Sequence, residues 1–240
     1  MDRVELLRFC ELIQNAEIER CEFLPVGSNR IFVAGMAMDG QKARVVYKPC
    51  AGETPLRDFP GGTLYKREYA AFRVSLELGW DLVPPTVIRN GPYGIGSMQL
   101  MIETSGRIRD LSDVSRGVPV FRQVALFDCV VNNADRKAGH LLKDRHGRLW
   151  IVDHGLTFHS VPKLRTVLWD FAGEEVPGNL LDDLKEFREK LKQDNALRKE
   201  LLRLLRETEI EAMERRISDV LAQPVFPRPS SPWSVPWPWY

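Results

Sequence analysis

The chain has 240 residues, of which 44% are hydrophobic and 28% are charged, a composition typical of a globular protein with a substantial core. Its formal net charge of +1 gives no global field that would attract nucleic acid or a membrane surface. No apolar run approaches the roughly 20 residues that a transmembrane helix requires, so we expect no transmembrane segment.

Two further features favour a cytoplasmic protein. The N-terminal stretch MDRVELLRFCELIQ is acidic and amphipathic, and it lacks the basic start and apolar core of a secretory signal. The four cysteines are widely spaced and form no CxxC pair: Cys10, Cys21, Cys50 and Cys129. We expect these thiols to be reduced and mostly buried, rather than joined in disulfides or bound to zinc.

The first half of the chain predicts a small β-sheet with one helix packed on it. Residues 16–25 alternate between apolar and polar side chains, and residues 26–49 predict a hairpin with turns at SNR and MDGQ. After a loop rich in Pro and Gly, residues 63–80 predict a helix capped by Thr63. Residues 83–103 predict two short strands around the turn RNGPYG. The apolar face of the helix comprises Leu64, Ala71, Val74 and Leu78.

The second half is predicted to be mostly helical. Residues 118–132 have the apolar spacing of a helix, and residues 140–155 predict a β-hairpin closed by the turn RHGR. Residues 178–222 predict two helices that separate near Asp194–Asn195. The Pro- and Trp-rich residues 224–240 predict an extended segment, either a disordered tail or a strap that lies on the protein or a partner.

Two aspartates flank the predicted hairpin of the second half. Asp135 follows a helix and Asp153 ends the second strand, so the path out and back along the hairpin returns both carboxylates to the same end. Two carboxylates held close, with Asn132, Asn133 and His140 nearby, are costly unless a positive charge lies between them. Hard oxygen ligands favour Mg²⁺, which takes phosphate oxygens as further ligands. The pattern therefore points to phosphoryl transfer.

A lysine in the first half completes this pattern. Lys48 ends the apolar strand ARVVYK, where a lone ammonium group would be costly, and Glu68 on the following helix is suited to pair with it. Pro49 ends the strand directly after the lysine. The turn VGSNR, residues 26–30, offers backbone N–H groups that would close over phosphates.

The order of these parts resembles the protein-kinase-like superfamily, in particular the atypical branch of phosphatidylinositol 3- and 4-kinases and their bacterial relatives. NNADRKAGHLL resembles the catalytic loop of that branch, WIVDHGLTF its metal-binding Asp-x-Gly segment, and VVYKP the strand that carries the ATP lysine. The type II phosphatidylinositol 4-kinases are particularly similar around the Asp-x-Gly segment. An uncharacterised, actinobacterial-type group of phosphatidylinositol-kinase-like proteins is similar over residues 16–172.

The resemblance implies a role for each residue of the pattern. Lys48 would contact the α- and β-phosphates of ATP, and Glu68 would orient it. Asp135 would be the catalytic base or would position the acceptor, and Asp153 would bind Mg²⁺. The remaining nucleotide contacts are assigned to the hinge residues Met101, Ile102 and Glu103 and to the phosphate-covering residues Val26, Gly27, Ser28 and Asn29.

Two residues depart from the family pattern. The metal-binding position five residues after Asp135 is usually Asn, and here it is His140. An imidazole there would favour Mn²⁺, contact a phosphate directly, or leave a site for a single metal ion. Lys137 stands where the lipid kinases commonly have His, and a lysine there would neutralise the γ-phosphate.

The resemblance implies an α+β, two-lobed protein-kinase-like fold. Residues 1–103 would form a small β-rich N-lobe with one main helix, residues 104–222 a mostly helical C-lobe, and residues 223–240 a Pro/Trp-rich tail. The leading hypothesis is an ATP- and Mg²⁺-dependent kinase whose acceptor is a protein, a small metabolite or a lipid headgroup.

Two alternatives stay open. A nucleotide-binding pseudokinase without turnover is favoured by His140 in place of Asn. A metal-dependent hydrolase would use Asp135, His140, Asp153 and His154 around a transition metal, and only the clustering of histidines supports it.

Overall fold

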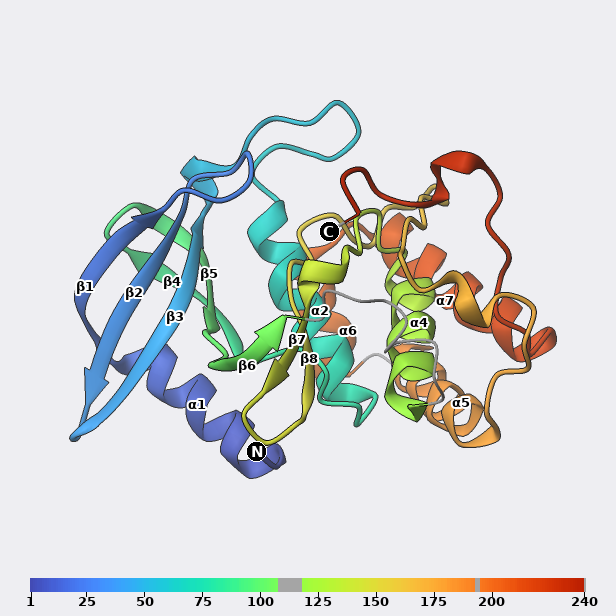
Figure 1. The fold of residues 1–240 in the computed structure, drawn as a ribbon, viewed down its shortest axis with the longest axis horizontal. Coiled ribbons are helices and arrows are strands. Elements are labelled where there is room, and N and C mark those ends of the chain that lie inside the picture. Colours follow the sequence, from blue (N-terminus) through green and yellow to red (C-terminus); the bar gives the residue numbers. More distant parts are fainter. Residues whose placement is uncertain (108–117, 193–194, 240) are drawn as a thin grey trace.

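The computed structural model describes residues 1–107, 118–192 and 195–239. These residues form two lobes, a β-sheet lobe and a mostly helical lobe, which Figure 1 shows side by side. No helix in these ranges is both long enough and apolar enough to cross a membrane.

The first lobe is built on a five-stranded antiparallel sheet in the order β1-β2-β3-β5-β4. Its strands are β1 (Glu17–Leu24), β2 (Ile31–Met38), β3 (Gln41–Pro49), β4 (Thr86–Gly91) and β5 (Gly94–Leu100). The predicted MDGQ turn joins β2 to β3, with Asp39 and Gly40 at φ values of 50° and 75°, as a tight hairpin requires. The expected hairpin and the two later strands are therefore confirmed.

A helix that the sequence analysis did not predict covers one face of this sheet. Helix α1 (Arg3–Asn15) starts with a capping box, in which the side chain of Asp2 accepts from the backbone N of Glu5 and the Glu5 side chain accepts from Asp2. Its buried Leu12 and Ile13 share one apolar core with residues of β2 and β3. The acidic, amphipathic N-terminal stretch is therefore a structural part of the first lobe.

The predicted helix over residues 63–80 is α2 (Leu64–Glu77). Thr63 is its N-cap residue, but the expected side-chain cap is wrong, because the Thr63 hydroxyl donates to the carbonyl oxygen of Pro60 at 2.6 Å. The carboxylate of Glu53 takes over this function and accepts from the backbone N of Tyr65 at 2.9 Å. A distant residue of the preceding loop therefore caps the helix.

Helix α2 shares its apolar core with the second lobe. Ala70, Phe72 and Val74 belong to the same cluster as the helices of the C-terminal half, whereas the sheet residues form a separate cluster with α1. A buried ion pair of 2.6 Å between Arg67 and Glu209 of α7 (Glu207–Ala222) adds to this attachment. Helix α2 is therefore fixed against the helical lobe, and the sheet rests on it.

The second lobe contains a small sheet and a set of helices. The sheet has the order β6-β7-β8, with β6 (Thr104–Arg107), β7 (Leu141–Asp144) and β8 (Leu149–Ile151), so the predicted hairpin is confirmed. The helices besides α7 are α4 (Pro119–Val131), α5 (Gly178–Lys192) and α6 (Ala196–Leu204). Short 3-10 turns of this lobe and its C-terminal segment cover Ala138–His140, Trp169–Phe171 and Pro232–Ser234, and another, Cys50–Gly52, follows β3 in the first lobe.

The described residues within 178–222 form three helices rather than the expected two. The additional break lies between Leu204 and Glu207, where the carboxylate of Glu209 accepts from the backbone N of Arg206 at 2.9 Å and starts α7. The apolar spacing continues across this break, and for that reason it was not visible in the sequence. The sequence analysis predicted that the two helices separate near Asp194–Asn195. Asp194 lies outside the described residues.

The Pro- and Trp-rich residues 223–239 pack on the helical lobe as a strap. Of the two alternatives, a disordered tail or a strap, the strap is therefore the correct one. The backbone N of Phe226 donates to the carbonyl of Glu174 at 2.9 Å, and the N of Thr166 donates to the carbonyl of Ser234 at 3.0 Å. Farther along, the carbonyl of Trp239 accepts from the N of Ala138 at 2.9 Å. The strap, red in Figure 1, therefore contacts residues between Ala138 and Glu174.

Candidate active site

A cavity of about 240 Å³ lies where the two lobes meet. Its walls come from the β1–β2 turn, the end of β3, the segment after β3, the start of α2, and the segments that precede β7 and follow β8. The charged side chains in these walls are Arg30, Lys48, Glu53, Glu68, Asp135, Lys137 and Asp153. Both cations and carboxylates therefore line one small space.

Lys48 is placed at the cavity by the end of strand β3. The pairing with β5 is close there, because a Cβ atom on Gly96 would lie 2.4 Å from the Lys48 carbonyl oxygen, and only glycine fits such an approach. The Lys48 ammonium group contacts the carboxylate of Glu68 and lies 2.8 Å from Oδ1 of Asp153. Lys48 therefore joins the sheet lobe to both α2 and the segment after β8.

Glu68 holds this arrangement together from α2. Its side chain is only 3% exposed, and one carboxylate oxygen contacts Lys48. The other oxygen accepts from the backbone N of His154 at 3.0 Å. Glu68 therefore fixes the lysine and the backbone next to Asp153 at the same time.

Asp153 follows strand β8 with a φ of 65°, in the left-handed region, which Asp tolerates better than most residues. This backbone turn leaves Oδ1 on Lys48 and places Oδ2 3.3 Å from Nε2 of His140. The Lys48 ammonium group holds the pKa of Asp153 well below its usual range. The aspartate therefore stays charged at neutral pH, with 49% of its side chain exposed.

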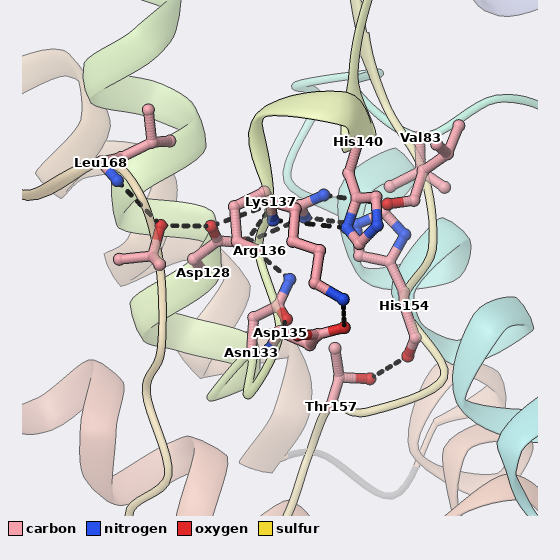
Figure 2. A network of polar contacts seen from close by, with 12 residues as sticks. Val83, Asp128, Asn133, Asp135, Arg136, Lys137, His140, His154, Thr157 and Leu168 are labelled. Carbon is pink, nitrogen blue, oxygen red and sulfur yellow. Dashed lines mark hydrogen bonds and ion pairs between the residues drawn. The ribbon is translucent and has the colours of Figure 1, made fainter. Parts of the chain in front are cut away.

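Asp135 is presented by the loop after α4. The C-cap residue of this helix is Asn132, which has a left-handed φ of 52°, and the backbone N of Asp135 donates to the side chain of Asn133 at 3.0 Å. Lys137 Nζ lies 3.0 Å from the Asp135 carboxylate, and Figure 2 shows the two side chains pointing toward each other. Burial raises the pKa of Asp135, although Lys137 opposes that shift. A carboxylate with a raised pKa is a better proton acceptor.

A buried network of polar side chains holds this loop in place. The sequence analysis did not identify this network. Arg136 is fully buried, and its guanidinium group binds the carboxylate of Asp128 on α4 at 2.9–3.1 Å. The same group contacts Nε2 of His154 at 2.8 Å, and its Nη1 donates to the carbonyl of Val152 at 2.9 Å. Figure 2 shows Arg136 between Asp128 and His154. It therefore links the loop that carries Asp135 to the segment that carries Asp153.

The structure thus brings Lys48, Glu68, Asp135, Lys137 and Asp153 to one cavity. The expected turn is there as well, since Val26 to Asn29 line the same space. That turn is tied down, because the backbone N of Thr54 donates to the Asn29 side chain at 2.8 Å. The roles assigned to these residues remain predictions.

The proposed hinge residues lie elsewhere. Met101, Ile102 and Glu103 connect β5 to β6, and they are not among the residues that line the cavity. The backbone N of Met101 donates to the carbonyl of Arg44 at 2.8 Å, so this group is already used within the first lobe. Adenine contacts by these residues stay a prediction.

Other lining residues were missed by sequence reasoning. Glu53, Thr54, Leu64 and Tyr65 come from the segment after β3 and from the start of α2. One carboxylate oxygen of Glu53 is buried and has no hydrogen-bond partner among the described residues. The closeness of these residues to Lys48 in the sequence was the only feature that indicated this part of the cavity wall.

The donor set suits a divalent cation that takes most of its ligands from nucleotide and water. Within the described ranges, no group of three or more His, Cys, Asp or Glu side chains is arranged to hold a metal ion. Asp153 and His140 nevertheless lie side by side, with Asp135 in the same cavity wall as Asp153. Mg²⁺ in nucleotide sites usually needs one or two protein carboxylates. The residues therefore fit such an ion.

His140→Asn is expected to reduce the decrease in the free energy of unfolding that accompanies a fall in pH from neutral to mildly acidic. Burial lowers the pKa of His140 to about 4, whereas an unfolded histidine titrates near about 6.5. Between these values the unfolded state binds more protons, so this contribution to stability is complete above about pH 6.5 and is lost as the pH falls toward 4. Urea denaturation at about pH 7 and 5 measures the difference.

His146→Asn is the matched control for this prediction, because His146 is exposed in the hairpin turn. Burial also lowers the pKa of His154, so a residual acid effect should remain in the His140 variant. Equal losses of stability in wild type and His140→Asn would contradict the prediction.

The other histidines have structural surroundings. His154 is fully buried and packs edge-to-face on Phe127. Nε2 of His159 lies 2.9 Å from the carbonyl of Asp58, and its ring packs on Phe59. The side chain of His154 therefore faces Arg136 and not a metal site, which removes the support for a metal-dependent hydrolase.

The four cysteines are all free and are partly buried rather than fully buried.

Comparison with solved structures shows the fold. The Golgi casein kinase superposes with a TM-score of 0.57 over 92% of this chain and 76% of that chain, at 14% identity. A second structure of the same protein, with Mn/ADP bound, matches with the same values. The expected two-lobed, kinase-like α+β fold is therefore confirmed.

Comparison with known sequences extends this result. No model of a known protein family matches the chain. Phosphatidylinositol 4-kinase gamma 4 of Arabidopsis thaliana is 35% identical over 94 residues, which cover 33% of this chain and 17% of that protein. Protein Rv2133c of Mycobacterium tuberculosis is 37% identical over 88% of each chain. The chain therefore belongs to the same protein family as Rv2133c.

Proposed function

We propose that the chain is an atypical kinase that transfers the γ-phosphate of ATP to a hydroxyl group of an acceptor. The observation that carries this proposal is the convergence of Lys48, Asp135 and Asp153 on one cavity of about 240 Å³. The kinase-like fold and the partial match to a phosphatidylinositol 4-kinase support it. We also propose that it is related to bacterial phosphatidylinositol 3-/4-kinase-like proteins.

The positive side chains bind the phosphates. Lys48 exchanges its contact with Asp153 for the α- and β-phosphate oxygens, while Glu68 keeps the ammonium group in place. Val26 to Asn29 cover the phosphates with the backbone of the β1–β2 turn. Once released from Lys48, Asp153 is free to hold a divalent cation together with His140.

The divalent cation is Mg²⁺ or Mn²⁺. When bound, it neutralises charge on the transferred phosphoryl group and its leaving oxygen. A nitrogen ligand such as His140 suits Mn²⁺ better than Mg²⁺, and the structure of the Golgi casein kinase with Mn/ADP is consistent with this choice.

Asp135 acts on the acceptor. Its carboxylate accepts the proton of the acceptor hydroxyl as the oxygen bonds to the γ-phosphorus, and the bond from that phosphorus to the bridging oxygen of ADP breaks. The products are a phosphate monoester and ADP, with the proton on Asp135. Lys137, 3.0 Å from this carboxylate, is placed to neutralise the γ-phosphate. The measurement of ADP release in wild type and Asp135→Asn tests the function.

A nucleotide-binding protein without turnover is the second candidate. His140 replaces the usual Asn and already contacts the carboxylate proposed to hold the cation. ADP with Mn²⁺ would then raise the melting temperature, but ADP release from ATP would not depend on Asp135.

Glu68→Gln is expected to weaken nucleotide binding about tenfold, because Lys48 loses the charge that orients it while the Gln oxygen still accepts from His154. Calorimetric titration with ADP and Mn²⁺ measures the affinity. Glu77→Gln on the same helix is the matched control, since Glu77 pairs with Arg73 instead. Unchanged affinity in Glu68→Gln would remove Glu68 from the nucleotide site.

A further inference from the structure

A second cavity, of about 530 Å³, lies in the helical lobe. We call it the strap pocket, because residues 223–234 of the C-terminal strap form one wall. Helix α7 and residues 162–165, which follow the Asp-x-Gly segment, form the others. Pockets of about 300–1,000 Å³ are the size that usually binds a ligand.

The lining of the strap pocket is cationic. Four basic residues line it: Lys163, Arg165, Arg216 and Arg228. Asp219 is the one carboxylate residue among its lining residues. Lys163 is neutralised from outside by Asp58 at 2.8 Å. Three arginines with a single carboxylate leave the pocket with a net positive charge.

Arg216 lacks an acceptor for part of its guanidinium group. Its Nε donates to the carbonyl of Val130 at 3.0 Å, whereas its Nη2 is buried without a hydrogen-bond partner among the described residues. Burial, with the nearby charge of Arg215, lowers the pKa of Arg216 to about 10. A buried donor without an acceptor is costly, and the positive charge of this guanidinium group adds to the attraction of the pocket for an anion.

The strap pocket adjoins the loop that carries Asp135. The backbone N of Arg165 donates to the carbonyl of Asn133 at 2.9 Å, and the carbonyl of Arg165 accepts from the N of Arg136 at 3.0 Å. These two bonds flank Asp135 on either side. A ligand that rests on the side chain of Arg165 therefore contacts a residue whose backbone is bonded on both sides of Asp135.

We propose that the strap pocket binds an acidic segment of a peptide acceptor. This inference rests on the phosphotransferase function proposed above. Arginine groups bind carboxylates in a two-pronged geometry, and Trp169 and Trp233 add apolar lining for neighbouring side chains. An anionic membrane is the weaker fit, because α7 also carries Glu211 and Glu214 and offers no polybasic run.

The test uses the full chain and a short fluorescent peptide of alternating Glu and Leu around one Ser. Wild type should bind this peptide in an anisotropy titration and should not bind the version with Gln in place of Glu. Arg228→Glu and Arg165→Glu should each weaken binding at least about tenfold. Arg203→Glu on α6, an exposed residue that does not line the pocket, is the matched control and should stay within about twofold.

Nucleotide binding is measured on the same samples by thermal shift with ADP and Mn²⁺. If wild type binds neither ADP nor ATP, the proposed phosphotransferase function fails, whatever the result with the peptide. If nucleotide binds and the acidic peptide does not, or if Arg228→Glu and Arg165→Glu bind the peptide as wild type does, the strap-pocket proposal is overturned. Pocket-dependent binding to phosphatidylglycerol vesicles without peptide binding would also overturn it.

Discussion

Asp135→Asn should lower the rate of ADP release from ATP by about 10²- to 10⁴-fold while leaving the affinity for ADP within about threefold. The reason is the position of Asp135, which lines the cavity and contacts Lys137 but forms no ion pair with Lys48. Its loss removes a proton acceptor and not a nucleotide ligand. Steady-state turnover with Mg²⁺ or Mn²⁺ and a calorimetric titration with ADP measure the two quantities.

Asp182→Asn on α5 is the matched control, because Asp182 is exposed and distant in sequence from the cavity residues. The Asp182→Asn variant should release ADP from ATP at the rate of wild type. Equal turnover in wild type and Asp135→Asn, with nucleotide binding intact, would favour a nucleotide-binding protein without phosphoryl transfer.

Asp128→Ala should lower the free energy of unfolding by about 3–5 kcal/mol, because it leaves the guanidinium charge of Arg136 buried without its partner. Both side chains are fully buried. Asp128 also accepts from the side chains of Asn133 at 3.0 Å and Thr166 at 3.2 Å. Urea denaturation followed by circular dichroism measures the change.

Asp170→Ala provides the comparison for this variant, since Asp170 is exposed in the same lobe. Its unfolding free energy should stay within about 0.5 kcal/mol of wild type. A change below about 1 kcal/mol for Asp128→Ala would mean that water or another group compensates Arg136.

The attachment of α2 to the helical lobe has a consequence for nucleotide binding. Glu68 lies on a helix that the Arg67–Glu209 ion pair fixes to α7, whereas Lys48 lies in the sheet lobe. A movement of the sheet relative to the helical lobe would therefore separate Lys48 from Glu68 and Asp153 together. The closed arrangement of these three groups depends on how the sheet rests on α2.

The sequence predicted those parts of the fold that local patterns determine. The strand that ends at Lys48 and the hairpin that returns Asp153 to the level of Asp135 follow from alternation and turn residues. Because these elements are regular, the convergence of the charged residues could be expected before any coordinates were known.

Contacts between distant residues could not be predicted in this way. Nothing local marks Glu53 as the cap of α2, or Arg136 as the partner of both Asp128 and His154. Helix α1 was missed although Asp2 begins a capping box, since its apolar face is narrow and many of its residues are exposed. Tertiary packing decides these features.

A crystal structure with ADP and Mn²⁺ tests the central claim most directly. The account predicts an anomalous manganese peak at coordination distance from Asp153, about 2.1 Å, with the nucleotide phosphates on the ammonium group of Lys48. Nucleotide bound outside the cavity between the lobes, or a cation away from Asp153, would contradict the account.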